Sequence, residues 1–170
     1  MSVFAPSTVI LWKVIESYGI DPAPLFAAEG IKIQLPIDPC MRLSYEKIDR
    51  IRAKGAELSG DEAFGLRAAT FYLPSQLGAL GYALHASLTL RRACVRLERF
   101  VRVLNDKARV SVEDSDRCLV VTIDLGRESV SETVRDDAAL ATVTQMFRSI
   151  SDDHFRLHSV SFKHAKPRDM

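Results

Sequence analysis

A few side chains in this sequence have types and spacings that chemistry could use, and each also has a plainer structural reading. His154 and His158 lie four residues apart, which suits a shared metal ion on one face of a helix. Their segment is leaving a predicted helix for a predicted strand, where the two rings do not converge. Asp136–Asp137 and Asp152–Asp153 are adjacent pairs, typical of a helix cap and of a loop after a helix. We therefore expect neither a metal site nor a catalytic pair.

The sequence also lacks the short motifs of common enzyme classes. It contains no G-x-S-x-G, no G-x-x-x-x-G-K-[ST], no H-E-x-x-H and no C-x-x-C. These motifs would supply a nucleophile, a phosphate-binding loop or a metal ligand set. We predict that the protein is not an enzyme and that it uses no cofactor.

Small-molecule binding is better supported by an apolar stretch in the middle of the chain. Residues 77–85, LGALGYALH, combine small and apolar side chains with a tyrosine and a histidine. Binding sites for small molecules are mostly apolar, with a few polar groups that orient the ligand. The preceding residues add two aromatic rings and a guanidinium group suited to a carboxylate or phosphate. The predicted effector-binding residues are Tyr82, His85, Arg67, Phe71 and Tyr72. A closed helix core is the plainer reading of the same residues.

Residues 89–105 predict a long amphipathic helix with an arginine-rich face. Its apolar side chains recur at helical spacing on one side, and the other side carries five arginines against one glutamate. The plain reading is a solvated face whose arginine stems cover neighbouring residues; an anionic effector site is an alternative. Val95 and Val103 lie among the arginines, which favours a partner surface. We predict a homodimer with Val95, Arg99 and Val103 in its interface, since symmetric dimers are the commonest oligomers.

Candidate helix caps recur along the first half of the chain. Ser7, Asp21, Ser44 and Asp61 each precede a helical pattern, and their side chains can accept hydrogen bonds from a first helical turn. The apolar stretch and the arginine-rich helix are separated by a predicted break near residues 86–87. The first half is therefore predicted to be mostly helical.

The second half changes character after Asn105. Residues 108–113 and 119–125 alternate between apolar and polar side chains around a polar turn, which predicts a β-hairpin. Asp136 or Asp137 is predicted to cap a further helix, and Val160 and Phe162 to belong to a third strand. The predicted class is α+β, with a small antiparallel sheet covered by helices.

Composition places few limits on function. A chain of 170 residues with 47% hydrophobic and 26% charged residues is typical of one soluble globular domain, here residues 1–170. Its net charge of +1 gives no general attraction to nucleic acid, and no stretch approaches the roughly 20 apolar residues that span a bilayer. Cys40, Cys94 and Cys118 are odd in number and lack metal-binding spacing, which favours reduced thiols in the cytoplasm.

Four stretches in order resemble one family of regulatory domains. They are LWKVIESYGIDPAPLFAAEGI, ELSGDEAFGLR, LGALGYALHASLTLRRA and VSFKHAKP. Together they resemble the N-terminal effector-sensing domain of AraC/XylS-type transcriptional regulators, in the branch whose sensing domain is largely helical. The resemblance implies binding of a small effector, dimerisation, and control of transcription through a separate DNA-binding domain.

That DNA-binding domain is not expected within this chain. The sequence ends at Met170, which leaves no room for a helix-turn-helix domain of about 100 residues. We expect DNA contact only through a domain absent from this chain, and no membrane contact. The alternative function, from a different class, is a stand-alone protein-interaction module that acts through the arginine-rich helix of residues 89–105.

Overall fold

The computed structural model describes residues 1–33, 37–38, 40–114, 118–126, 131–151 and 155–165. Its α-helices are α1 (Thr8–Glu16), α2 (Pro22–Ala28), α3 (Tyr45–Ser59), α4 (Gly78–His85), α5 (Leu90–Phe100) and α6 (Glu132–Ser151). Its 3-10 helices are η1 (Ala5–Ser7), η2 (Phe64–Phe71), η3 (Pro74–Leu77) and η4 (Val101–Val103). Its strands are β1 (Ser2–Phe4), β2 (Arg42–Ser44), β3 (Arg109–Asp114) and β4 (Leu119–Asp124).

Side-chain caps begin several of the helices where the sequence predicts them. The carboxylate of Asp21 accepts a hydrogen bond from the Ala23 amide at the start of α2. The Ser44 hydroxyl accepts one from Lys47 at the start of α3, and α3 ends at Gly60 in the left-handed conformation. The Asp61 carboxylate accepts a hydrogen bond from the Ala63 amide ahead of the next helix, but that helix is the 3-10 helix η2, whose first residue has no side-chain cap.

The apolar stretch and the arginine-rich helix are separate helices, α4 and α5, as the sequence predicts. Thr89 begins α5 by accepting a hydrogen bond from the amide of Arg92. α4 packs closely on η3: a Cβ atom placed on Gly81 would lie 2.0 Å from the carbonyl oxygen of Pro74. Only glycine allows this approach of the two backbones.

The strands form two separate antiparallel pairs. β3 and β4 make the predicted hairpin, in which Val110 pairs with Ile123 and Val112 with Val121. β1 and β2 make a second, short pair that the sequence did not predict, and Val3 of β1 also bridges to Asn105. β1 therefore connects the N-terminal helices to the chain that enters the hairpin.

Two predictions for the end of the chain are wrong. The last helix does not begin at Asp136 or Asp137, because α6 starts at Glu132 and the Arg135 amide already donates to the Ser131 carbonyl. The third strand expected around Val160 and Phe162 does not form within the described residues 155–165. This segment lies along α6 instead and contacts it through side chains.

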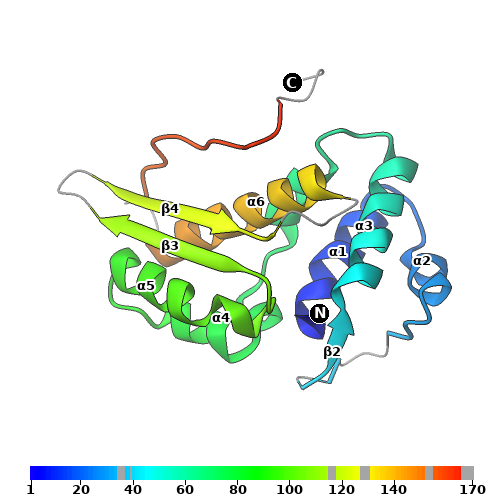
Figure 1. The fold of residues 1–170 in the computed structure, drawn as a ribbon, viewed down its shortest axis with the longest axis horizontal. Helices are drawn as coiled ribbons and strands as arrows, with labels where there is room; N and C mark the ends of the chain where they lie inside the picture. The colour runs from blue at the N-terminus through cyan, green and yellow to red at the C-terminus, as the bar shows by residue number, and fades with distance from the viewer. Residues whose placement is uncertain (34–36, 39, 115–117, 127–130, 152–154, 166–170) are drawn as a thin grey trace.

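Helix α6 connects two hydrophobic cores. The first core gathers buried side chains of α1, α2, α3 and η2, and the second gathers those of α4, α5, η4 and β3. Near its start, α6 adds Val134 and Ala138 to the edge of the first core. Near its end, it adds Met146 and Phe147 to the second core. Figure 1 shows α6 behind the hairpin, with α4 and α5 below the strands and α1, α2 and α3 beyond one end of the hairpin. The predicted α+β class is confirmed.

Candidate functional site

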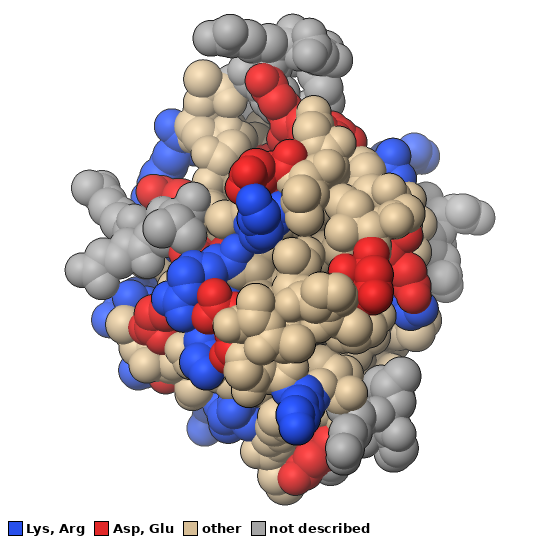
Figure 2. Space-filling view, turned by 90° about the vertical axis from the view of Figure 1, so that its right-hand side faces the viewer, with Lys and Arg blue, Asp and Glu red and all other residues tan. Residues whose placement is uncertain are grey.

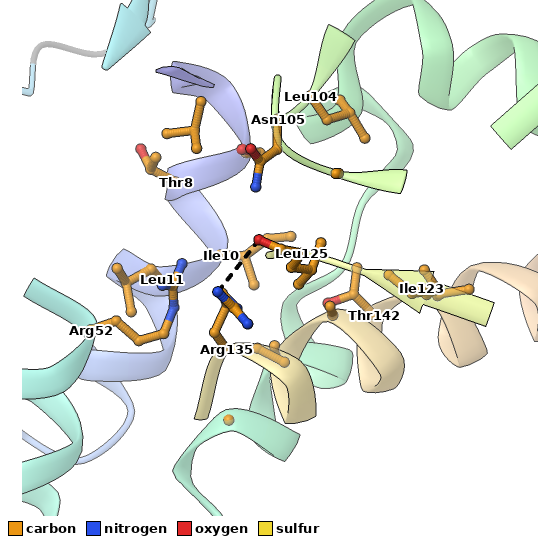
Figure 3. A pocket seen from close by; sticks show the side chains of 18 of the residues that line it. Thr8, Ile10, Leu11, Arg52, Leu104, Asn105, Ile123, Leu125, Arg135 and Thr142 are labelled. Atoms are coloured by element: carbon orange, nitrogen blue, oxygen red, sulfur yellow. Dashed lines mark hydrogen bonds between the residues drawn. The ribbon is translucent and has the colours of Figure 1, made fainter. Parts of the chain in front are cut away.

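A cavity of about 220 Å³ lies between the two cores. Its walls come from α1, α3, η2, the hairpin and α6, so segments from both halves of the chain are needed to form it. Most of the lining is apolar, with Ile10 and Leu11 from α1 and Ile123 and Leu125 from the hairpin side (Figure 3). A cavity of this kind suits the apolar part of a small molecule.

The cavity also contains a buried arginine from α6. Arg135 is only 5% exposed, and its Nη1 atom donates to the Tyr45 hydroxyl at 2.6 Å. Its Nε and Nη2 atoms donate to the Asp136 carboxylate at 3.0 and 2.8 Å. A longer contact of 3.5 Å joins Nη1 to the Leu125 carbonyl oxygen, the dashed line of Figure 3. Burial by itself would lower the pKa of Arg135, but the hydrogen bonds to Tyr45 and Asp136 outweigh it and raise that pKa.

A second guanidinium group enters the same cavity from α3. Arg52 Nη1 donates to Asp49 at 3.2 Å and to the Ser131 hydroxyl at 3.4 Å, and that hydroxyl donates to Asp49 at 2.5 Å. Tyr45, Asp49 and Arg52 are spaced four and three residues apart, so they share one face of α3. In Figure 3 the side chains of Arg52 and Arg135 lie near each other beside Leu11.

The two guanidinium groups affect each other electrostatically. Burial lowers the pKa of Arg52, Asp49 opposes this shift, and the positive charge of Arg135 reinforces it. One end of the cavity thus has two guanidinium groups with their carboxylate partners, within an otherwise apolar lining. This arrangement can bind and orient a ligand, and the described part of the lining offers no group paired to act as nucleophile and base.

The family comparison agrees with the sequence resemblance. The family described as the arabinose-binding domain of AraC transcription regulators, at their N-terminal side, matches residues 19–170. The chain belongs to this family. This family is one of ligand-sensing, regulatory domains and is not a known enzyme class. No protein of curated function matches the sequence. Within the described residues, no helix of this AraC-type domain has both the length and the apolar character to cross a membrane.

The five predicted effector residues do not meet in the cavity of the AraC-type domain. The Tyr72 hydroxyl lies 3.1 Å from His85 Nε2, so the fold does bring these two together. Arg67 stacks on the Tyr18 ring, with its Cζ atom 4.1 Å from the ring centroid. Phe71 packs against the first core, and Tyr82 is 61% exposed. None of the five lines the cavity between the cores, and their role in effector binding stays a prediction.

The three predicted dimer residues lie on the outside of the domain. Val95 and Val103 are each 52% exposed, and Arg99 is also exposed. The neighbouring Phe100 is 43% exposed and lies under the Arg99 guanidinium, 5.2 Å from the ring centroid. Their exposure is what an interface needs, and their place in a dimer stays a prediction.

Charges of both signs mix on another face of the domain. Figure 2 shows basic and acidic side chains interspersed there, without a continuous basic surface. Ion pairs such as Arg50–Glu29 at 2.6 Å and Lys54–Glu57 at 2.9 Å neutralise part of the surface charge of the domain. This face lacks the single-sign field that attracts a phosphate backbone.

Sequence reasoning missed both cavity arginines. Arg52 and Arg135 look like surface residues because charged side chains are almost never buried without a partner. One signal was available on α3, where Tyr45, Asp49 and Arg52 follow the same helical spacing as the apolar residue Ile48 and its neighbours. For α6 no such signal existed, since Arg135 stands directly before two aspartates that resemble a cap.

The sequence-level metal candidates fall mostly outside the described residues. His154 and Asp152–Asp153 are not described, and His158 is exposed. Across the ranges that are described, no three histidine, cysteine, aspartate or glutamate side chains gather closely enough to hold a metal ion.

Proposed function

We propose that this chain is the effector-sensing domain of a transcriptional regulator and that it binds a small molecule in the cavity between its two cores. The observation that carries the proposal is the make-up of this cavity. It is apolar over most of its lining, it contains the half-buried Arg52 and the buried Arg135, and it is formed jointly by both halves of the chain.

A ligand in this position would act on the whole domain. It would contact the first core through α1 and α3 and the second through the hairpin, while α6 runs past both. A ligand that binds more tightly when the two cores are packed against each other would increase the fraction of molecules in that arrangement. Because residues 155–165 lie along α6, a shift of this helix would also reach the C-terminal segment.

The test is a thermal-shift screen of metabolites on the parent protein and two α6 variants. Ala139 lines the cavity and Ala141 does not, so Ala139→Leu fills the site and Ala141→Leu is the matched control. A ligand that raises the Tm of the parent and of Ala141→Leu should fail to raise that of Ala139→Leu. If Ala139→Leu responds as strongly as the parent, the site lies elsewhere.

A second pair of variants tests the effector-binding residues that the sequence predicts on α4. Tyr82→Ala and His85→Ala remove side chains from α4 that do not line the cavity. With the same ligand, binding by calorimetry should stay within about twofold of the parent if the cavity is the site. A loss of binding in His85→Ala alone would place the ligand at the Tyr72–His85 pair.

We further propose that the domain forms a homodimer through the exposed side of α5 and η4. The support is that Val95, Phe100 and Val103 are exposed next to Arg99 on an otherwise charged helix face. Several large apolar side chains exposed together are typical of a protein–protein interface, and symmetric dimers are the commonest oligomers. Sedimentation velocity at about 100 μM should detect a dimer of even micromolar affinity. Val95→Glu combined with Val103→Glu should give a monomer that keeps the parent's circular dichroism.

The alternative use of the same surface is binding of a different protein. It is favoured if the parent is monomeric while the double variant Val95→Glu and Val103→Glu loses the regulator's effect on transcription. In either case we propose that DNA contact comes from another domain and that the protein works in the cytoplasm. Residues 1–170 alone should then give no sequence-specific footprint at physiological salt.

A further inference from the structure

If the cavity is the effector site proposed above, the two arginines at one end of it narrow the chemical class of the ligand. Arg52 is a cavity-lining residue whose side chain is 18% exposed. Among the described residues, its guanidinium group donates hydrogen bonds only from Nη1, to Asp49 and Ser131. Its Nε and Nη2 atoms form the other edge of the planar group, and this edge has donors to offer a ligand.

Arg135 is more fully engaged than Arg52. Its Nε, Nη1 and Nη2 atoms all donate to protein groups, which fix the guanidinium in place. Tyr45 accepts one of these bonds with its oxygen, so its hydroxyl proton can still be donated toward the cavity. Arg52 would therefore be the principal binding group. Arg135 would contribute a nearby positive charge, and the Tyr45 hydroxyl would donate a further hydrogen bond to the ligand.

The charges nearby decide how much negative charge a ligand can carry. Asp49 and Asp136 already balance the two arginines formally, so net charge alone does not attract an anion. The unused N–H groups of Arg52 do attract an anion, because a guanidinium edge binds a carboxylate through two parallel hydrogen bonds. A dianion would add repulsion from the two aspartates, so a single negative charge fits best.

The volume limits the rest of the ligand. A dry protein cavity of about 150 Å³ is large enough for benzene, so a cavity of about 220 Å³ has room for roughly nine non-hydrogen atoms. Except for the arginine end and a few hydroxyl and amide groups, the lining offers methyl and methylene groups to this body.

We propose that the effector is a small monocarboxylic acid with an apolar body, whose carboxylate binds the free edge of Arg52 beside Arg135 and Tyr45. The apolar body extends between α1 and the hairpin. Two neighbouring classes fit less well: an ammonium group has no acceptor for the Arg52 N–H groups, and phosphate monoesters bring too much negative charge and a tetrahedral head.

The first experiment compares acids with their uncharged analogues. Thermal shift and calorimetry are measured with octanoate against octanamide and with phenylacetate against phenylacetamide, each at about 5 mM. At least one acid should raise the Tm by about 3 °C or more, and its amide should bind at least about tenfold more weakly. Phenyl phosphate and octylamine should give no shift.

The second experiment tests Arg52 with a matched control. Arg50 lies on the same helix, but its ion pair with Glu29 is at the surface, and it does not line the cavity. Arg52→Gln should weaken the acid at least about tenfold and bring acid and amide to similar affinity, while Arg50→Gln should leave both unchanged. If Arg52→Gln does not fold, Arg52→Lys keeps the charge but removes the planar edge, and it should also reduce the preference for the acid.

The outcomes separate this inference from the proposed function. If the amides bind as tightly as the acids and Ala139→Leu abolishes binding of both, the cavity is a binding site but the carboxylate class is wrong. The same holds if phenyl phosphate binds more tightly than phenylacetate. If no acid or amide changes the Tm, the carboxylate inference is overturned, and the metabolite screen with Ala139→Leu decides the proposed function separately.

Discussion

Asp137 on α6 and His164 near the end of the chain are joined by a hydrogen bond of 3.0 Å between Oδ1 and Nε2, across 27 positions of sequence. Asp137 is almost completely buried, and its other carboxylate oxygen has no hydrogen-bond partner within the described structure. At the other end of the same helix, the Phe155 ring packs 6.4 Å from that of Phe147. These two contacts hold residues 155–165 antiparallel to α6, as the returning segment in Figure 1 shows.

The first prediction concerns the pH dependence that Asp137 imposes. Burial raises the pKa of Asp137 above its ordinary value of 3.8, and His164 only partly opposes this shift. The protonated carboxyl is therefore favoured by folding, and the stability it contributes is present below about pH 3.8 and is lost as pH rises through the raised pKa. Asp137→Asn should have a higher Tm than the parent at pH 7, and the difference should shrink toward pH 4.

The neighbouring aspartate is the control for that prediction. Asp136 holds Arg135 through two hydrogen bonds, so Asp136→Asn should lower the Tm at pH 7 instead of raising it. Thermal melts from pH 4 to pH 8 measure both variants. An Asp137→Asn protein that is less stable than the parent at pH 7 would show that the charged pair with His164 outweighs the cost of burial.

The second prediction concerns the buried hydrogen bond between Tyr45 and Arg135. Tyr45→Phe leaves a guanidinium N–H in the interior without its acceptor, which should cost about 1–3 kcal/mol in the free energy of unfolding. Tyr82→Phe removes a hydroxyl from an exposed ring and should change stability by less than about 0.5 kcal/mol. Urea denaturation of both variants measures the difference, and equal effects would contradict the importance assigned to the Tyr45–Arg135 contact.

The third prediction concerns the close packing of α4 on η3. In Gly81→Ala the new Cβ atom would lie 2.0 Å from the Pro74 carbonyl oxygen, so one of the two backbones must move. We expect a loss of about 2–4 kcal/mol in unfolding free energy, as for other overpacked or strained sites. Gly19→Ala is the comparison, because Gly19 has open space around it and only a positive φ of 73°. It should cost only about 1 kcal/mol.

The fourth prediction distinguishes the three cysteines. Cys40 and Cys118 are exposed, whereas Cys94 lies on the buried face of α5, and burial raises the pKa of its thiol to about 11. The thiolate is the reactive form, so Cys94 should resist modification at pH 8 until the protein unfolds. Ellman's reagent should titrate two thiols of the folded protein within minutes and the third only in guanidinium chloride. Rapid reaction of the third thiol in native buffer would contradict the burial of Cys94.

Much of the local structure could be predicted because its causes lie within a few residues. Asp21, Ser44 and Thr89 cap helices with their own side chains, and each cap needs only the amides two or three residues ahead. The hairpin follows from the alternation of side chains along β3 and β4. Gly60 ends α3 because its left-handed backbone suits glycine.

The errors lie where a neighbour distant in sequence decides the outcome. Val160 and Phe162 have the composition of a strand, but residues 155–165 form side-chain contacts with α6 and so no ladder. Asp137 resembles a cap, yet it lies inside α6 because η2 packs against the start of that helix. A Cβ atom on Gly65 of η2 would lie 2.3 Å from the Val134 carbonyl oxygen and 2.8 Å from the Cβ atom of Asp137.

The sequence alone determined the α+β class, most of the helix ends and the family, since these depend on local spacing and on ordered motifs. The tertiary structure alone decided where the cavity lies and which residues line it. Arg52 and Arg135 are far apart in the chain, and in the sequence each resembles a surface residue. No periodicity predicts that α3 and α6 direct these two side chains into the same cavity. The physical reason is that a charge in the interior also needs partners from other elements, and only the folded chain brings Ser131 to Arg52 and Tyr45 to Arg135.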